Sequence, residues 1–372
     1  MRRLTPLDGG DWRAVAQAVR ERFDVDGPAL FLGSSTPPRE VTDTTAAVIE
    51  TSGSTGYPKR VVLSEAALRA SADATAHALG GDGQWLLALP ASYVAGLQVL
   101  VRSHVAGLPV VQVDPGFDVE AFAAASARLD APRRYTALVP AQLARLVEAP
   151  EAAARFDAIL VGGQALPAAL AARARDVGLR VVRTYGSTET ATGCLYDGYP
   201  VGGTRTRLVD GVLELAGPTL ADGYLGDPEL TARAFVEEGG VRWYRTGDRA
   251  RIHDDGRVEV LGRADNVIVS GGINVSLDRV EAVVREMPGL EQAVVVAASS
   301  ERWGEVPVVV VARATDAAGS RIADDLLPSI RRLLLERIGP AAQPDRIVVL
   351  PELPLLTSGK PDRRALAALA AR

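Results

Sequence analysis

Hydrophobic and polar positions alternate along the first half of the chain in a way that predicts strands interleaved with helices. Short apolar runs predict strands at residues 46–50, 85–89, 110–113, 136–139, 158–161 and 180–183. Between them, helical spacing predicts helices such as 65–79, with Ser64 as its N-cap, and 97–106. This alternation favours a mainly parallel sheet covered by helices.

The pattern changes near residue 200 and again near residue 265. Residues 200–262 are expected to form a β-rich subdomain, because the dipeptides Asp210-Gly211 and Asp255-Gly256 are typical of hairpins. Beyond it, a Gly-Gly turn and a helix capped by Ser276 predict a small α+β unit, with strands at 267–270, 293–297, 308–312 and 347–350, and helices at 322–338 and the carboxyl end. The predicted fold is therefore α/β, with a large domain at 1–263 and a small C-terminal domain at 266–372.

Composition narrows the class of protein. A length of 372 residues favours two domains, and a net charge of −5 without blocks of like charge gives no indication of nucleic-acid or membrane-surface binding. The apolar runs have strand length, so no membrane span is expected. A single cysteine, Cys194, excludes an internal disulfide and suits a reducing compartment. These features predict a soluble cytoplasmic protein, and a homo-oligomer remains possible.

Lysine usage points to two loops. Of the 41 basic residues, all but Lys59 and Lys360 are arginine. A bias of this kind suggests that arginine replaces lysine wherever either would serve, so the two lysines mark positions that need a compact ammonium group. Both lysines lie in Gly-rich, Pro-flanked loops and not on a helix surface, which argues against the interpretation that they persist at these positions by chance.

The first of these loops has the composition of a phosphate-binding turn. It follows a predicted strand and consists of Thr51, Ser52, Gly53, Ser54, Thr55, Gly56, Tyr57, Pro58 and Lys59. Glycines allow close backbone approach, hydroxyls and amides donate hydrogen bonds to phosphate oxygens, and a lysine supplies charge. The Walker pattern does not fit this segment. A plain flexible turn is an equally good interpretation from spacing alone.

Further candidate residues follow later predicted strands. Residues 183–190 end a predicted parallel strand, where open α/β sheets bind ligands. There, Tyr185 could stack on a base and Glu189 could hold Mg²⁺, although a solvated turn is also plausible. Asp248 and Arg263 could bracket ribose hydroxyls or form a structural ion pair. Gly162 and Gly163 could face a ligand or simply form a loop.

Taken in order, these motifs resemble the adenylate-forming superfamily of acyl-CoA synthetases, adenylation domains and luciferases. The resemblance runs from about residue 46 to the C-terminus and rests on TSGSTGYPK (51–59), GGQALP (162–167), YGSTET (185–190), YRTGD (244–248), GRADNVIVSGGINV (262–275) and PLLTSGKPDRRAL (354–366). It implies an enzyme that uses ATP and Mg²⁺ to convert a carboxylic acid to an acyl adenylate and then transfers the acyl group to coenzyme A.

The resemblance also implies roles for individual residues. Lys360, Glu189 and Thr188 match catalytic positions, and Glu189 also matches the Mg²⁺ contact. The predicted hinge is Asp265, and the predicted coenzyme A contacts are Gly271 and Gly272. The predicted ATP- and AMP-binding residues are Thr51, Ser52, Gly53, Ser54, Thr55, Gly56, Lys59, Gly162, Gly163, Tyr185, Gly186, Ser187, Asp248 and Arg263.

The acyl site is predicted from residues 89–103, which resemble the o-succinylbenzoate–CoA ligases of menaquinone biosynthesis. Tyr93, Gly96, Gln98 and Arg102 are the candidates, and Arg102 would hold the second carboxylate unless it is an ordinary surface arginine. Two other functions stay open: an adenylating enzyme that loads a carrier protein, and a non-catalytic ligand-sensing relative. Departures from the family pattern are Arg60 in place of a usual glycine, Tyr93 in place of a histidine, Asn266, Arg279 and a short region of about fifty residues before the phosphate loop.

Overall fold

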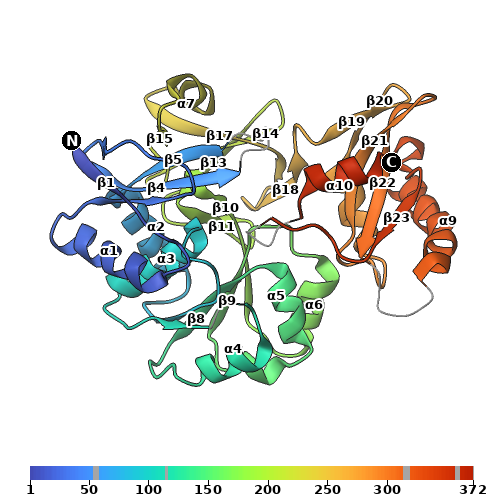
Figure 1. Cartoon of the computed structure of the whole chain (residues 1–372). Helices are drawn as coiled ribbons and strands as arrows, with labels where there is room; N and C mark the ends of the chain where they lie inside the picture. The colour runs from blue at the N-terminus through green and yellow to red at the C-terminus, as the bar shows by residue number, and fades with distance from the viewer. Residues whose placement is uncertain (53–57, 114–115, 313–318, 357–360, 372) are drawn as a thin grey trace.

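The structure is a computed structural model that describes residues 1–52, 58–113, 116–312, 319–356 and 361–371. Figure 1 shows a larger part that holds the amino-terminal sheets and a smaller part built from the last hundred residues or so. None of the described helices is both long and apolar enough to cross a membrane.

The amino-terminal residues build a mixed sheet with the strand order β15-β5-β4-β2-β1-β3. Its strands are β1 (Arg2–Pro6), β2 (Ala29–Leu32), β3 (Glu40–Val41), β4 (Thr45–Ser52), β5 (Pro58–Ser64) and β15 (Gly223–Tyr224). The predicted strand at 46–50 therefore lies in this sheet and not beside the other predicted strands. The reason is local, because β4 turns back into β5 and pairs with it antiparallel, while its other edge pairs with β2.

The second sheet has the order β12-β11-β10-β9-β8-β6-β7 and is parallel from β7 to β10. Helices cover both faces: α2 (Glu65–Ala78) and α3 (Val94–Val105) pack on Trp85 and Leu87, and α4 (Val119–Ser126), α5 (Pro140–Val147) and α6 (Ala168–Asp176) pack on Leu86. The predicted helix-covered, mainly parallel sheet is thus confirmed. Its strands are β6 (Gln84–Leu87), β7 (Val111–Gln112), β8 (Arg134–Leu138), β9 (Ala158–Val161), β10 (Val181–Ser187), β11 (Thr192–Tyr196) and β12 (Tyr199–Pro200).

The helices of the large part fill the space between the first two sheets and cover the outer face of the second (Figure 1). Ser64 caps α2 as predicted, since its hydroxyl accepts a hydrogen bond from the N–H of Ala67 at 3.1 Å. The helices are α1 (Trp12–Asp24), α2 (Glu65–Ala78), α3 (Val94–Val105), α4 (Val119–Ser126), α5 (Pro140–Val147) and α6 (Ala168–Asp176), with 3₁₀ turns η1 (Pro150–Ala152) and η2 (Thr188–Thr190).

A third sheet forms the predicted β-rich subdomain. It orders its strands β13-β14-β17-β16, with β18 paired to β17. The Asp210-Gly211 turn has φ values of 52° and 76°, as the predicted hairpin requires. The elements are β13 (Arg205–Val209), β14 (Val212–Ala216), β16 (Phe235–Glu238), β17 (Val241–Ile252), β18 (Val258–Arg263) and α7 (Pro228–Ala234).

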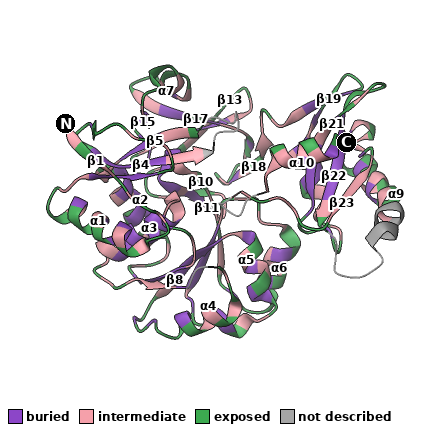
Figure 2. Ribbon diagram, viewed as in Figure 1, coloured by how far each residue is buried: buried purple, intermediate pink, exposed green. Residues whose placement is uncertain are grey.

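The C-terminal part has its own sheet, β20-β19-β22-β21 with β23 beside β22, and its own buried interior (Figure 2). Val280 and Val284 of α8 pack with α9 on one face, and Leu366 of α10 packs on the other. The elements are β19 (Val267–Ser270), β20 (Ile273–Ser276), α8 (Leu277–Val284), β21 (Val294–Ser300), β22 (Gly304–Ala312), α9 (Gly319–Arg337), η3 (Pro340–Ala342), β23 (Ile347–Leu350) and α10 (Arg363–Ala370).

Candidate active site

The candidate site is organised around the carboxyl end of β10, where the chain makes a bulge at Tyr185 and Gly186 and enters η2. A Cβ on Gly186 would lie 1.9 Å from the carbonyl oxygen of Thr192, so this close return of the chain requires glycine. Ala191 and Thr192 then adopt φ values of 50° and 109°, which side-chain-bearing residues rarely adopt. Such strain commonly accompanies functional sites.

Glu189 lies on η2 and is 9% exposed. Its Oε1 accepts a hydrogen bond from the Tyr224 hydroxyl at 2.9 Å, and no other hydrogen bond or ion pair to this carboxylate occurs in the described part of the chain. Burial, followed by the charge of Glu189, raises the pKa of Tyr224, so this hydroxyl remains a donor. Glu189 thus has a fixed orientation and a carboxylate oxygen left over for a cation.

The carboxylate of Glu189 suits an Mg²⁺ ion that is bound together with substrate phosphates. Groups of three or more potential metal-ligating side chains are missing from the described residues. Glu189 offers one buried carboxylate, and Mg²⁺ commonly combines one or two carboxylates with substrate phosphates and water. The arrangement suits a metal ion that arrives with a nucleotide.

Tyr185, Asp248 and Arg263 come together although they are far apart in sequence. The Tyr185 hydroxyl donates to Asp248 Oδ2, and Arg263 Nη1 lies 3.3 Å from Asp248 Oδ1. Burial raises the pKa of Asp248, and burial with the neighbouring Asp248 charge raises the pKa of Tyr185. The predicted Asp248–Arg263 pair is therefore present in the structure as a direct contact.

Arg263 also contacts the predicted hinge. Its Nε and Nη2 donate to the two carboxylate oxygens of Asp265 at 2.9 and 3.0 Å, while its Nη1 donates to the carbonyl oxygen of Thr246 at 2.8 Å. The hydrogen bonds from Arg263 lower the pKa of Asp265, despite some burial. One guanidinium group therefore joins Asp265 to Asp248.

Two of the predicted sites lie at least partly outside the described residues. In the predicted phosphate loop these are Gly53, Ser54, Thr55 and Gly56, and in the C-terminal loop Lys360 is outside as well. At the ends of the predicted phosphate loop, Thr51 pairs with Lys59 and Ser52 pairs with Pro58 between β4 and β5. Lys59 Nζ lies 5.6 Å from the centre of the Tyr224 ring. Tyr224 therefore connects Lys59 with Glu189.

The paired glycines differ in their surroundings. Gly162 follows β9, and a Cβ there would lie 2.4 Å from Thr184 Oγ1, so the turn packs tightly against β10; Gly163 has a φ of 79°. Gly271 and Gly272 form the turn between β19 and β20, which Figure 1 shows directed away from the large part. The structure does not bring these two glycines to Tyr185 or Glu189.

The acyl-site candidates lie on and before α3. Tyr93 is the N-cap residue, and a Cβ on Gly96 would lie 2.1 Å from the carbonyl oxygen of Pro90. Gln98 is fully buried and donates to the Leu68 carbonyl at 3.2 Å. Arg102 is 5% exposed, which excludes the interpretation that it is an ordinary surface arginine.

Several residues of the site are missing from the sequence-based set. Tyr224 orients Glu189, and Asp278 accepts from the backbone N–H of Arg263 at 2.7 Å and from Asn266 at 2.7 Å. Thr246 accepts from the backbone N–H of Asp248 at 2.9 Å. Thr246 stands inside the YRTGD motif, which could have revealed it, whereas nothing in the local pattern marks Tyr224 or Asp278.

Comparison with known proteins agrees with this geometry. The family described as AMP-binding enzyme matches residues 6–225, and the AMP-binding enzyme C-terminal domain matches residues 279–360. A protein of Mycobacterium tuberculosis described as a probable 2-succinylbenzoate–CoA ligase is 39% identical over 90% of this chain and 87% of its own length. The 2-succinylbenzoate–CoA ligase of Geobacillus kaustophilus is 30% identical, over 96% and 78%.

Among solved structures, the o-succinylbenzoate–CoA synthetase of Bacillus subtilis in complex with its acyl-adenylate intermediate has the same fold. Its TM-score is 0.74 at 24% identity, covering 95% of this chain and 80% of that one. The chain belongs to the AMP-binding enzyme family, as the six motifs predict. Within that family it is an AMP-forming acid–CoA ligase, a class that uses ATP with Mg²⁺ and coenzyme A.

Proposed function

We propose that the acid activated by this ligase is 2-succinylbenzoate, also called o-succinylbenzoate, and that the enzyme serves menaquinone biosynthesis in the cytoplasm. A carboxylate oxygen of the acid attacks the α-phosphorus of ATP, and pyrophosphate leaves. The thiol of coenzyme A then attacks the acyl carbon, AMP leaves and the thiol proton is released. The names of relatives at 39% and 30% identity support this substrate.

The observation that carries the substrate proposal is the environment of Arg102. Its Nη2 donates to Thr192 Oγ1 at 3.0 Å, and its guanidinium lies 4.9 Å from the Trp85 ring centre. Within the described ranges no carboxylate pairs with it, and its Nε has no hydrogen-bond partner. A buried cation without a counter-ion is costly, so an anionic ligand would be favourable there.

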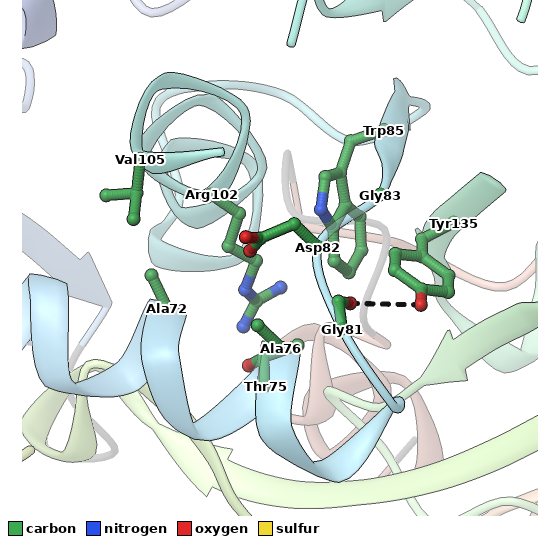
Figure 3. A pocket seen from close by; sticks show the side chains of 10 residues that line it. All are labelled: Ala72, Thr75, Ala76, Gly81, Asp82, Gly83, Trp85, Arg102, Val105 and Tyr135. Atoms are coloured by element: carbon green, nitrogen blue, oxygen red, sulfur yellow. Dashed lines mark hydrogen bonds between the residues drawn. The ribbon is translucent and has the colours of Figure 1, made fainter. Parts of the chain in front are cut away.

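The direction of approach follows from the packing around Arg102. Figure 3 shows its side chain extending from α3 toward α2, in a pocket that Asp82, Trp85 and Tyr135 also line. The cavity at this point measures about 10 Å³, enough for a single water molecule. We therefore assign the second carboxylate to the side of Arg102 that faces Thr192, two residues after η2. Gly96 and Gln98 precede Arg102 on the same helix, and Tyr93 is the N-cap residue of that helix.

The remaining assignments follow the same logic. Glu189 would hold Mg²⁺, which when bound offsets the charge of the phosphate oxygens. Asp248 would accept hydrogen bonds from ribose hydroxyls beside Arg263, and Tyr185, Gly162 and Gly163 would border the adenine. Thr188, Lys59, Lys360 and the loop from Thr51 would donate to phosphates. Asp265 would act as the hinge that brings Gly271 and Gly272 toward coenzyme A.

A panel of acids tests the proposal. Pyrophosphate release is measured with 2-succinylbenzoate, with benzoate, with 2-succinylbenzoate esterified at the ring-attached carboxyl, and with fatty acids. We expect the highest kcat/KM for 2-succinylbenzoate, because only it places a second carboxylate at Arg102. Better activity with benzoate or a fatty acid would remove the substrate proposal. If 2-succinylbenzoate is preferred but Arg102→Ala leaves kcat/KM unchanged, the residue assignment alone is wrong.

A carrier-protein acceptor is the second candidate. A protein of Salinispora arenicola described as a probable non-canonical nonribosomal peptide synthetase is 34% identical over 96% of this chain, although the match spans 5% of that much longer protein. The acceptors are distinguished by giving the acyl adenylate either coenzyme A or a phosphopantetheinylated carrier protein. Faster transfer to coenzyme A supports the ligase function, and faster transfer to the carrier would replace it.

A further inference from the structure

Arg60 occupies the position after Lys59 where the family usually has glycine. The contacts of its guanidinium group indicate why an arginine stands there in this chain. Its Nη2 donates to Ser35 Oγ at 2.7 Å and to the carbonyl oxygen of Thr36 at 3.0 Å. Its Nε lies 3.5 Å from Glu50 Oε1. Arg60 therefore connects β5 to the loop that follows β2.

Glu50 completes this connection from β4. Its Oε2 accepts hydrogen bonds from the backbone N–H of Ser34 at 2.9 Å and of Ser35 at 3.1 Å, and the Ser35 hydroxyl also donates to the carboxylate. A Cβ on Gly33 would lie 2.6 Å from Glu50 Cβ, so the loop can pass this closely only with glycine. Burial would raise the pKa of Glu50, but the hydrogen bonds from Ser35 and Ser34 hold it below its ordinary value. We call Ser34, Ser35, Glu50 and Arg60 the Glu50–Arg60 clamp.

The clamp lies on the face of the sheet opposite to Thr51 and Lys59, two of the predicted phosphate contacts. Glu50 and Arg60 are directly opposed between β4 and β5, and Thr51 and Lys59 form the next pair toward the loop. Because successive side chains of a strand point to opposite faces, Arg60 is directed away from the face that carries Lys59. Arg60 is therefore placed to support Lys59 and not to contact ATP itself.

β5 transmits this support to the other side of the site. The carbonyl oxygen of Arg60 accepts from the N–H of Leu225 at 2.8 Å, and Val61 pairs with Tyr224. Tyr224 lies under Lys59 and donates to Glu189. A shift of β5 against β4 would consequently displace Lys59, Tyr224 and Glu189 together.

We propose that the Glu50–Arg60 clamp is a positioning device for adenylation: it locks β5 against β4 and the β2 loop and so holds Lys59 and Tyr224 in place for ATP. The proposal rests on ATP-dependent adenylation and not on the identity of the acid. It predicts a selective defect, because the triphosphate takes part in the first half-reaction and is absent from the second.

The test compares the two half-reactions in the full-length enzyme. For Arg60→Ala we expect kcat/KM for ATP in ATP–pyrophosphate exchange to fall roughly ten-fold, with the larger change in KM for ATP. The rate of thioester formation from preformed acyl adenylate and coenzyme A should stay within about two-fold of wild type. Arg60→Lys, which restores the charge without the fork, should recover part of the exchange activity.

Arg69→Ala is the matched control. Arg69 contacts the Glu65 carboxylate at 2.7 Å and the Phe23 carbonyl oxygen at 3.3 Å, and its guanidinium lies 4.5 Å from the Phe23 ring centre. Arg60 likewise contacts a carboxylate (Glu50), a carbonyl oxygen (Thr36) and an aromatic ring (Phe31). The Arg69→Ala variant should leave both half-reactions unchanged. Unaltered exchange in Arg60→Ala, or equal losses in both half-reactions, would overturn the proposal. If Arg60→Ala does not fold, Glu50→Gln is judged by the same half-reaction split.

Discussion

Replacing Arg102 with methionine should separate stability from activity. Arg102 is 5% exposed, yet its described partners are one hydroxyl, Thr192, and one ring, Trp85. Those contacts contribute about 1.5–3 and about 2 kcal/mol. Desolvation of an unpaired guanidinium costs several kcal/mol. Methionine fills similar volume, keeps a favourable contact with the Trp85 ring of about 1 kcal/mol, and removes the buried charge.

We therefore expect the free energy of unfolding of Arg102→Met to be equal to the wild-type value or up to about 2 kcal/mol higher. Thr192 retains a hydroxyl partner in Ser71 at 3.1 Å. At the same time, kcat/KM for 2-succinylbenzoate should fall about a hundred-fold, equivalent to about 2.7 kcal/mol of lost charged hydrogen bonding. Benzoate, which lacks the second carboxylate, should show no comparable loss.

Arg22→Met is the control for this reasoning. Arg22 is as buried as Arg102, at 4% exposed, but it pairs with Asp26 at 2.9 Å and with Glu65 at 3.1 Å. Its replacement should lower the free energy of unfolding by about 1–3 kcal/mol. Urea-induced unfolding followed by circular dichroism measures both variants. If Arg102→Met is destabilised as much as Arg22→Met, the charge of Arg102 is compensated within the protein and the argument for an anionic ligand fails.

Three further predictions concern the hinge, the lysine and the clamp. Lys360→Ala should abolish acyl-adenylate formation but spare thioester formation from preformed adenylate; near-normal ATP–pyrophosphate exchange would contradict this role. Asp265→Pro should do the reverse, since proline stiffens the hinge, while Asp265→Ala controls for loss of the contact with Arg263; equal loss of both half-reactions would exclude a hinge function. The folded-state pKa of Glu50 is lowered from 4.5. The loss of unfolding free energy in Glu50→Gln should therefore be constant above pH 4.5 and shrink as the pH falls through the folded-state pKa. Urea titrations at several pH values measure this difference, and a difference that grows on acidification would contradict the assignment.

The sequence predicted the second sheet better than the first, and the cause is physical. Buried parallel strands such as β9 are continuous apolar runs, which stand out from the helices around them. β1, with the sequence Arg-Arg-Leu-Thr-Pro, has one buried side chain, Leu4. Its strand conformation comes from pairing with β2, more than twenty residues away, which no local pattern records.

The same distinction holds for the candidate site. Asp248 and Arg263 stand in recognisable motifs, from which the sequence predicts either ribose contacts or a structural ion pair, and in the structure the two side chains are in contact. The contact of Tyr224 with Glu189 spans 35 residues and depends on β15 pairing with β5. The burial of Arg102 was left open, although residues 96–103 are all buried and their mainly apolar sequence is typical of an enclosed helix.

The single guanidinium shared by Asp248 and Asp265 has an energetic consequence for the catalytic cycle. Arg263 contacts Asp248 at 3.3 Å and Asp265 at 2.9 and 3.0 Å, so a rotation about Asp265 that broke the contact of Asp265 with Arg263 would change the electrostatic environment of Asp248. Any nucleotide that binds more tightly in one domain arrangement must favour that arrangement by the same free energy. With the proposed roles of Asp248 and Asp265, the affinity for the adenylate and the arrangement of the two domains would then be coupled through one side chain.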